Sequence, residues 1–342
     1  MLIIRPVQAD DLQDLLELAV KAGKGMTSLP EDPDTLSAKI QKSIDSFNRR
    51  EAHDDDFFWL VMEDLDRKKV VGTSGVYART GTRQAFYAYR LISQNHHSHT
   101  LDKQVRSEIL QLSNDYTDCS EVGTLFLDPD YRGNGHWLAK CRYLLMAQFP
   151  ERFAPYVIAE LRGWSDEDGR SPFWEAIGRH FFEMDFDEAD TLCGVGSNQF
   201  ITELMPKHPI YTRLLPQEAQ DVIGKPMDAG RRAMELLEEE GFMYDKVVDI
   251  FDAGPILRAK VDQLKTIKKM DQGLAAVSDE RMLTSPTMIA TSSLRHFRVI
   301  HEPMIRTGGG QVKLAQEHIE ALAVTPGALL RYVPKFSKSR YH

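Results

Sequence analysis

The chain has 342 residues, with 42% hydrophobic and 27% charged side chains and a formal net charge of −9. This length predicts about two domains with a large core, and the negative charge argues against a nucleic-acid-binding protein, which needs a basic face. No apolar run approaches the roughly 18 residues of a membrane span, and residues 1–6 do not form a signal peptide. Since the cysteines form no C-x-x-C pair, free thiols in a cytoplasmic protein are expected.

The first part of the chain alternates strand and helix signals. Residues 2–6 form a predicted strand, and Asp10 or Asp11 caps a helix that ends at Gly23. A second helix begins near Asp34. Residues 57–63 and 70–77, joined by a polar turn, then predict a β-hairpin.

Residues 79–118 interrupt this order. They contain His96, His97 and His99, followed by a segment at 105–112 whose apolar spacing predicts a helix. Three neighbouring histidines suggest either a metal site or a polar loop or site-lining segment. No Cys, Asp or Glu stands nearby at ligand spacing, so the second interpretation is favoured and no metal site is predicted.

A strand, a glycine loop and a helix follow in the stretch 122–149. Residues 122–127 are an apolar run typical of a buried strand, and Asp128-Pro129-Asp130 is a turn signal. The loop Arg132-Gly133-Asn134-Gly135 leads into a helix whose apolar stripe starts at Leu138.

This order of elements has a chemical meaning. Glycines let the backbone approach a ligand closely, and the free N–H groups of a first helical turn favour an anion such as pyrophosphate. The same glycine loop can also be interpreted as an ordinary tight turn between strand and helix, without a ligand. Neither G-x-G-x-x-G nor G-x-x-x-x-G-K-[ST] occurs in the sequence.

The next hundred residues again alternate strand and helix signals. A strand is predicted at 157–161, and Ser171-Pro172 opens a helix that buries Phe173, Ile177 and Phe181. Cys193 to Ser197 is interpreted as a loop. A helix at 233–240 ends at Gly241, and a strand follows at 244–251.

From Pro255 the composition changes. The basic 260s predict a solvated face or linker. Strands are expected near Met288 and at 297–301, 311–314 and 329–333, with a short helix at 317–322. These signals predict a small, mostly β C-terminal subdomain.

Several runs resemble those of bacterial arginine N-succinyltransferases, in the same order, from residue 1 to about residue 255. They are Gly25-Met26-Thr27-Ser28-Leu29-Pro30, Leu112-Ser113-Asn114-Asp115, Ser171-Pro172-Phe173-Trp174-Glu175-Ala176, Gly178-Arg179-His180-Phe181-Phe182, Glu203-Leu204-Met205-Pro206, His208-Pro209-Ile210-Tyr211 and Val248-Asp249-Ile250-Phe251-Asp252. The glycine loop resembles the acyl-CoA motif of the wider GCN5-related N-acyltransferases, although Asp130 stands where that motif has Gln or Arg.

The resemblance implies an α+β fold of the acyl-CoA N-acyltransferase (GCN5-related) type over residues 1–254, with an insertion at about 79–118 and the C-terminal subdomain at 255–342. It implies transfer of the succinyl group of succinyl-CoA to the α-amino group of L-arginine, which gives N2-succinyl-L-arginine and CoA in arginine catabolism. Succinyl-CoA is then a co-substrate, with no permanently bound cofactor. A homo- or hetero-oligomer with a homologous subunit is expected.

The resemblance also assigns roles to residues. The acyl-CoA site would consist of Leu125, Phe126, Leu127, Arg132, Gly133, Asn134 and Gly135. The succinyl carboxylate needs a cation, for which the candidates are Arg90, Arg162 and Arg179, and the guanidinium of arginine needs a carboxylate, for which they are Glu160, Asp185 and Glu203.

One departure from the family concerns proton transfer. The family's proposed proton donor is a histidine, and Met227 stands at that position in the run Gly224-Lys225-Pro226-Met227-Asp228. A thioether does not exchange a proton at neutral pH. Either His208, Tyr211 or His96 replaces the histidine, or solvent protonates the thiolate, or the acceptor is a different amine, or this chain is a non-catalytic subunit beside an active partner.

Overall fold

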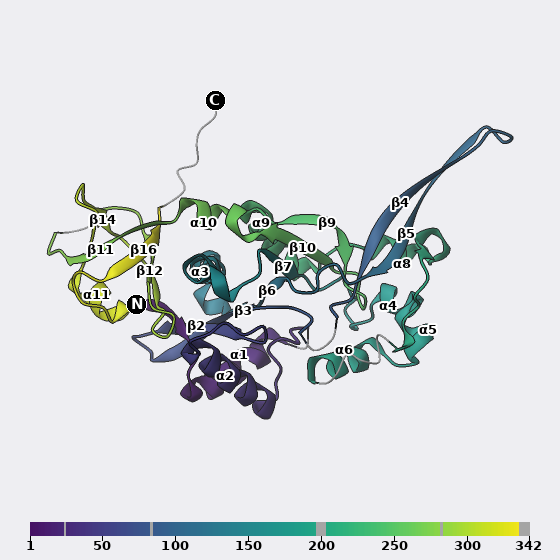
Figure 1. Cartoon of the computed structure of the whole chain (residues 1–342). Coiled ribbons are helices and arrows are strands. Elements are labelled where there is room, and N and C mark those ends of the chain that lie inside the picture. Colours follow the sequence, from purple (N-terminus) through teal and green to yellow (C-terminus); the bar gives the residue numbers. More distant parts are fainter. Residues whose placement is uncertain (24, 83–84, 196–202, 281–282, 335–342) are drawn as a thin grey trace. The chain divides into compact units, whose positions relative to one another are not determined.

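The computed structural model describes residues 1–23, 25–82, 85–195, 203–280 and 283–334. The chain forms two compact units (Figure 1). Unit 1 consists of Met1–Ala78, Val122–Pro155 and Val261–His342, and unit 2 of Arg79–Glu121 and Tyr156–Lys260. None of the helices in the described ranges has the length and apolarity needed to span a membrane.

Unit 1 is built on a mixed sheet with strand order β14-β15-β11-β16-β12-β13-β1-β2-β3-β6. Its first elements are β1 (Leu2–Pro6), α1 (Leu12–Ala22), α2 (Pro33–Asn48), β2 (Phe57–Asp64), β3 (Lys69–Tyr77), β6 (Ser120–Leu127, whose first two residues belong to unit 2) and α3 (Gly135–Gln148). Its last elements are α10 (Lys265–Lys269), β11 (Asp271–Val277), β12 (Thr287–Thr291), β13 (Val299–Glu302), β14 (Ile305–Arg306), β15 (Gln311–Leu314), α11 (Gln316–Leu322) and β16 (Leu329–Val333).

Helices cover both faces of this sheet around β3. A Cβ atom at Gly72 would lie 2.9 Å from Leu138 of α3, so α3 packs closely on that face. The side chains of Phe57 and Trp59 point to the other face, where they pack with the apolar stripes of α1 and α2. Figure 1 shows α1 and α2 on one side of β2 and β3 and α3 on the other.

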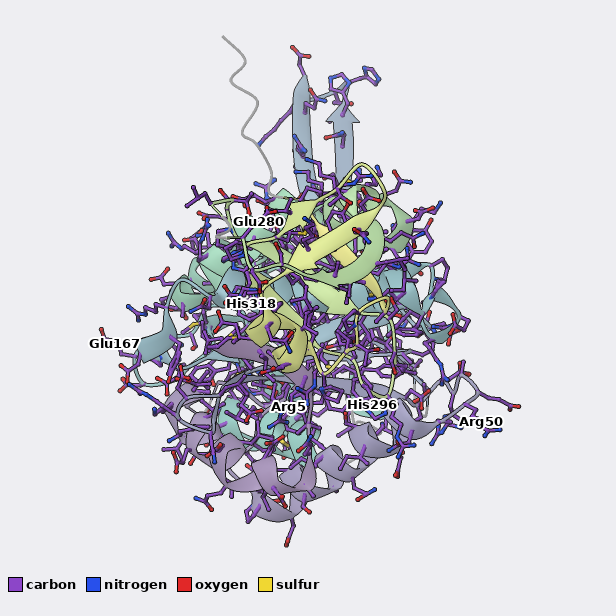
Figure 2. All side chains as sticks on the ribbon, turned by 90° about the vertical axis from the view of Figure 1, so that its left-hand side faces the viewer. Arg5, Arg50, Glu167, Glu280, His296 and His318 are labelled. Atoms are coloured by element: carbon purple, nitrogen blue, oxygen red, sulfur yellow. The ribbon has the colours of Figure 1, made fainter. Side chains whose placement is uncertain are left out.

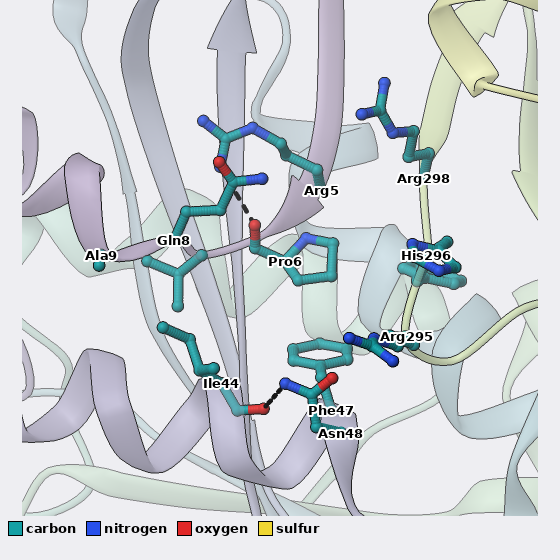
Figure 3. Close-up of a pocket in the computed structure, with 12 residues that line it drawn as sticks. Arg5, Pro6, Gln8, Ala9, Ile44, Phe47, Asn48, Arg295, His296 and Arg298 are labelled. Atoms are coloured by element: carbon teal, nitrogen blue, oxygen red, sulfur yellow. Dashed lines mark hydrogen bonds between the residues drawn. The ribbon is translucent and has the colours of Figure 1, made fainter.

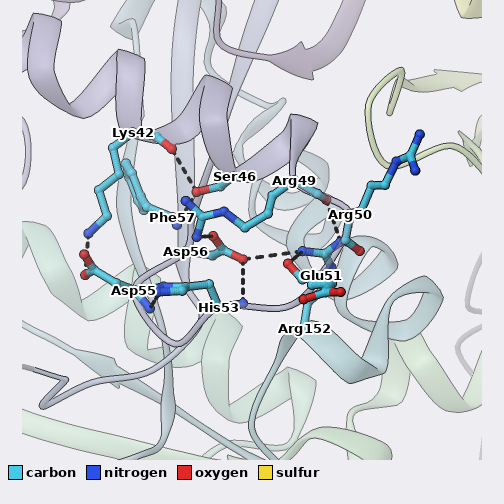
Figure 4. Close-up of polar contacts among 10 residues, drawn as sticks. All are labelled: Lys42, Ser46, Arg49, Arg50, Glu51, His53, Asp55, Asp56, Phe57 and Arg152. Carbon is cyan, nitrogen blue, oxygen red and sulfur yellow. Dashed lines mark hydrogen bonds and ion pairs between the residues drawn. The ribbon is translucent and has the colours of Figure 1, made fainter.

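Buried charges fix the end of α2 (Figure 4). The Asp56 carboxylate is fully buried, and it accepts a hydrogen bond from Arg49 at 2.8 Å and lies 3.5 Å from Arg152. The Arg152 guanidinium also donates to the carbonyl oxygens of Arg49, Arg50 and Glu51 at 2.6–2.7 Å. One guanidinium therefore satisfies carbonyl groups at and just beyond the end of the helix.

The strands of unit 2 follow one another in the order β7-β10-β9-β4-β5-β8, and Ser120 and Glu121 at the start of β6 pair with β7. Its elements are β4 (Ala88–Ser98), β5 (Lys103–Ser113), β7 (Tyr156–Glu160), α4 (Pro172–Ala176), α5 (Gly178–Phe182), α6 (Phe186–Val195), β8 (Ile210–Tyr211), α8 (Gln217–Val222), α9 (Arg231–Glu240), β9 (Met243–Val248) and β10 (Pro255–Lys260). Its main core gathers aromatic side chains, among them Tyr89, Phe173 and Trp174, which are fully buried.

The predicted helix at 105–112 is wrong. These residues lie in β5, which pairs with β4 from Ala88–Ser113 to Ser98–Lys103 in one long antiparallel hairpin (Figure 1). The turn is closed with Asp102 at φ +43°, a conformation that Asp tolerates. His96 and His97 consequently lie on a strand near the exposed hairpin end rather than in a loop.

Two further predictions need correction. Phe181 is 43% exposed, and its neighbour Phe182 takes the core position because the helix breaks at Ile177 into α4 and α5. Cys193 lies in α6 rather than in a loop, and residues 196 and 197 lie outside the described residues.

The expected division at residue 254 stays a prediction. Within the described structure, β10 directly follows that position and pairs with β7 and β9 of unit 2. The segment 79–118, expected as an insertion, lies in unit 2.

Candidate functional site

The candidate acyl-CoA site starts on β6. On the side away from β3, β6 pairs in parallel with β7 at Ser120–Val157 and Glu121–Ile158, and this pairing does not continue into residues 122–127 in the described structure. Leu125, Phe126 and Leu127 are half-buried there. A strand segment without a neighbour on one side presents unpaired N–H and C=O groups, which suit an extended amide chain such as pantetheine.

Thr124 gives β6 an unusual geometry. Its φ is +50°, which is rare for a β-branched residue, and its side chain is 2% exposed. The Thr124 hydroxyl is buried without a hydrogen-bond partner in the described part of the chain. Such strain is frequent at functional sites, and it changes the direction of the backbone just before Leu125.

The turn after β6 is firmly anchored. Asp128 is buried, its N–H donates to the Val71 carbonyl at 2.8 Å, and its carboxylate accepts from Lys21 and from the N–H of Asp130. The Tyr131 hydroxyl donates to Asp64 at 2.7 Å. These contacts hold the strand end and the start of the glycine loop in one conformation.

The glycine loop opens α3 without a side-chain cap. Gly133 has φ +100°, which favours glycine, whereas Gly135 begins the helix. The Asn134 side chain makes no capping hydrogen bond, because it accepts from the Trp137 indole and donates to the Tyr131 carbonyl, both at 3.0 Å. No acidic residue occupies the first turn of α3, so its N–H groups and the exposed Arg132 can receive an anion.

A buried arginine ties α3 to β6. Arg142 is 2% exposed, and its guanidinium donates to the Ala139 carbonyl at 2.9 Å and to the Gly123 carbonyl at 3.4 Å. The helix after the loop is thereby fixed against the strand before it.

Unit 2 contains an acidic cluster that the sequence did not reveal as a whole. We use this name for Glu160, Asp249 and Asp252. Asp252 is 4% exposed and accepts from the N–H groups of Gly163 and Gly254, both at 2.8 Å. Arg162 lies 3.5 Å from the Asp252 carboxylate.

Burial and mutual repulsion shift the pKa values in this cluster. Burial, and after it the charge of Asp249, raise the pKa of Asp252 to about 7 against the opposing effect of Arg162. Burial also raises the pKa of Asp249, although the N–H groups of Phe251 and Asp252 donate to it. Loss of water around the carboxyl group, and after it the charges of Glu121, Asp249 and Asp252, raise the pKa of Glu160 well above its ordinary value, although the residue as a whole is exposed at the end of β7.

Met227 lies beside this cluster. Its N–H donates to the Arg162 carbonyl at 2.8 Å, and its sulfur accepts from the Ser165 N–H at 3.2 Å. The position at which the family has its histidine therefore lies next to the residue that pairs with Asp252.

The three candidate replacements for that histidine are not brought together by the structure. Tyr211 is 44% exposed on β8 and pairs with Ile109 of β5. His208 is exposed just before β8. His96 lies four residues along β4 from Ile92, the partner of Ile109, which is roughly 13 Å of strand.

The candidate ionic residues already have partners. Arg90 pairs with Asp115 and Asp245, Arg162 pairs with Asp252, and Arg179 pairs with Glu175 and Asp185, so Asp185 is also engaged. Glu203 is exposed. Of the predicted carboxylates, Glu160 is the one that belongs to the acidic cluster.

Comparisons with known proteins agree with the resemblance seen in the sequence. The family model described as arginine N-succinyltransferase beta subunit matches residues 2–266. An arginine N-succinyltransferase from Escherichia coli strain 55989 is 41% identical over 338 residues, which cover 97% of each chain. The solved structure of arginine/ornithine succinyltransferase subunit AI from Pseudomonas aeruginosa is 33% identical, covers 98% of this chain and 99% of that chain, and superposes with a TM-score of 0.89.

These matches, with the order of elements described above, confirm the predicted α+β fold of the N-acyltransferase type. They also cover nearly the whole length of the chain, including the part after residue 255 where the resemblance in the sequence fades. The chain belongs to the arginine N-succinyltransferase family of acyltransferases.

Proposed function

We propose that this protein transfers the succinyl group of succinyl-CoA to the α-amino group of L-arginine, giving N2-succinyl-L-arginine and CoA. The observation that carries the proposal is the end of the β6–β7 pairing after Glu121, with Thr124 strained at φ +50° and the uncapped first turn of α3 behind the glycine loop. The part of β6 that β7 does not cover suits the amides of pantetheine, and the loop suits the pyrophosphate of CoA.

The reaction exchanges the carbon–sulfur bond of the thioester for a carbon–nitrogen bond of an amide. The neutral amine nitrogen attacks the thioester carbonyl carbon, the carbon–sulfur bond breaks, and CoA leaves as a thiolate that takes a proton from solvent. The amine loses one proton on the way. A carboxylate with a pKa of about 7 is partly ionised at neutral pH, so Asp252 is suited to accept that proton.

The acidic cluster also suits the cationic acceptor. A guanidinium binds carboxylates through paired hydrogen bonds, and a cation relieves the repulsion among crowded carboxylates. Glu160 is the cluster member predicted for this role from the sequence, and Asp249 is a second candidate because it is half-buried rather than enclosed.

Met227 favours a second candidate function. Since a thioether exchanges no proton, the chain would then be a non-catalytic subunit of a hetero-oligomeric succinyltransferase. The solved relative from Pseudomonas aeruginosa is described as a subunit, and as an arginine/ornithine enzyme, so L-ornithine is the alternative acceptor to test. We also propose that the protein is cytoplasmic and that it assembles with a homologous subunit.

Release of CoA thiol from succinyl-CoA by the purified protein tests the proposal, with L-arginine, L-ornithine or no amine, and with acetyl-CoA as the paired donor. Thermal unfolding with and without CoA separates the two candidate functions. If CoA raises the melting temperature but no thiol is released, the chain is a subunit that binds CoA without catalysing transfer. If CoA neither stabilises the protein nor is released, the chain is a non-catalytic subunit that does not bind CoA.

A further inference from the structure

A cavity of about 260 Å³ lies in unit 1, away from β6 (Figure 3). It is lined by residues 5–9 at and just after the end of β1, by Ile44, Phe47 and Asn48 from α2, and by residues 295–298 from the segment before β13. Since the strand order is β13-β1-β2-β3-β6, two strands separate β1 from the candidate acyl-CoA strand.

The cavity opens where two strands part. β1 and β13 are paired at Ile4–Val299 and at no other described position. Continuing this antiparallel register by one residue places Arg5 opposite Arg298, and both side chains line the cavity. Like charges directly across a strand pair are destabilising, so the carboxylates around this pair of arginines matter.

Arg5 already has its compensation. Its guanidinium donates to both carboxylate oxygens of Asp11 at 2.8 Å and to Glu63 at 2.5 Å. The positive charge of Arg5 is therefore balanced by Asp11 and Glu63, and Arg5 lines the cavity without being available to a ligand.

Arg298 and Arg295 lack such compensation. Arg298 donates to the Ala321 carbonyl at 2.8 Å, and within the described residues no carboxylate forms an ion pair with it or with the exposed Arg295. Burial, and next the charge of Arg5, lower the pKa of Arg298 against the opposing charge of Glu63. No Asp or Glu is among the residues that line it.

We propose that this cavity is a binding site for a small dianion, inorganic phosphate or a short dicarboxylate, held by Arg295 and Arg298. The guanidinium fork matches the paired oxygens of both ligands. His296 lines the same opening and adds a ring N–H donor. In Figure 2 the labels of His296 and Arg5, which line the same cavity, lie next to each other, whereas Arg50 is at the right-hand edge of the view.

Thermal unfolding of the full chain at pH 7.5 tests the site, with sodium phosphate or sodium succinate added and sodium chloride adjusted to hold the ionic strength constant. We expect a saturable rise in Tm with at least one of the two anions. R295Q and R298Q should each weaken the apparent affinity roughly 10- to 100-fold. R295Q keeps the test valid if R298Q folds poorly, because Arg295 is exposed and makes no ion pair that the described structure shows.

Two matched variants control for other anion sites. R50Q removes an exposed arginine of the same unit that does not line the cavity, and R132Q removes the cation of the glycine loop. Both should keep the phosphate or succinate response. The proposal is overturned if neither anion gives a saturable rise, if the rise survives in both R295Q and R298Q, or if R132Q abolishes it. A response to phosphate alone or to succinate alone identifies the ligand class.

Discussion

Lys21 of α1 donates a hydrogen bond to the buried carboxylate of Asp128, the residue that joins β6 to the glycine loop. Burial alone would raise the pKa of Asp128, but the bonds from Lys21 and from the Asp130 N–H hold it below its ordinary value of 3.8. A carboxylate with a lowered pKa adds stability above its unfolded pKa and loses it as the pH falls through the folded pKa.

We therefore expect D128N to lower the free energy of unfolding at pH 7 by about 1 kcal/mol, a value discounted because Lys21 is partly exposed. The difference from the wild type should shrink as the pH falls below 3.8, where the wild-type carboxylate also becomes neutral. Urea unfolding at pH 7 and pH 3 measures both values. D130N changes an exposed carboxylate nearby, and an equal loss in that variant would contradict the role given to Asp128.

The two glycines of the loop should respond differently to alanine. Gly133 has φ +100°, so G133A should cost about 1 kcal/mol of unfolding free energy by backbone strain alone, since a Cβ there meets no atom within 4 Å. G135A should be neutral or slightly stabilising, because its Cβ would meet Leu127 at an ordinary 3.9 Å on a helical backbone. Equal costs in denaturant unfolding would show that the loop has another conformation. CoA protection should be weaker in G133A than in the wild type.

Arg152 should be the most costly arginine to replace near α2. R152M leaves Asp56 buried beside a neutral side chain and frees three carbonyl groups, so we expect a loss of about 3 kcal/mol. R49M removes the other partner of Asp56, but Arg49 is 39% exposed and its loss should cost less than about 1 kcal/mol. Chemical unfolding of both variants gives the comparison. Similar losses would mean that the carbonyl contacts of Arg152 contribute nothing.

Asp252 makes the folding stability depend on pH with the opposite sign to Asp128. Its folded pKa of about 7 lies above the unfolded value of 3.8, so the stability it contributes is complete below pH 3.8 and is lost as the pH rises through 7. D252N should flatten this decline, although it also disturbs one of the two N–H contacts to Gly163 and Gly254.

The same variant tests proton transfer. If Asp252 accepts the amine proton, kcat/KM of the wild type should rise with pH around an apparent pKa near 7, and D252N should lose that limb and roughly a hundredfold in rate. M227L should keep the wild-type rate and pH profile, because the Met227 thioether exchanges no proton. An unchanged profile in D252N would remove Asp252 from the mechanism.

Local patterns predicted much of this structure. Strand β6, the turn at Asp128 and helix α3 follow one another directly, so periodicity and turn residues sufficed to place them. The error at β5 arose because Val105, Ile109 and Leu112 also fit a helical spacing. These residues form a strand because they pair with β4, and the apolar spacing within residues 105–112 alone does not predict that pairing.

The acidic cluster could not be predicted in the same way. Glu160 ends β7, whereas Asp249 and Asp252 follow β9, and the strand order β7-β10-β9 brings them together. Their raised pKa values come from this packing and from burial, neither of which a motif expresses. The run Val248-Asp249-Ile250-Phe251-Asp252 supported the family resemblance without revealing its neighbour Glu160. The roles of His208, Tyr211 and His96 stay predictions.

The most direct test of the account is the initial rate of thiol release from succinyl-CoA by the purified chain with and without L-arginine. We expect release that depends on L-arginine and saturates with it, that is slower with acetyl-CoA, and that falls in D252N but not in M227L. Absence of amine-dependent release with both L-arginine and L-ornithine, from a protein that unfolds cooperatively, would contradict the proposed transferase activity and leave the non-catalytic subunit.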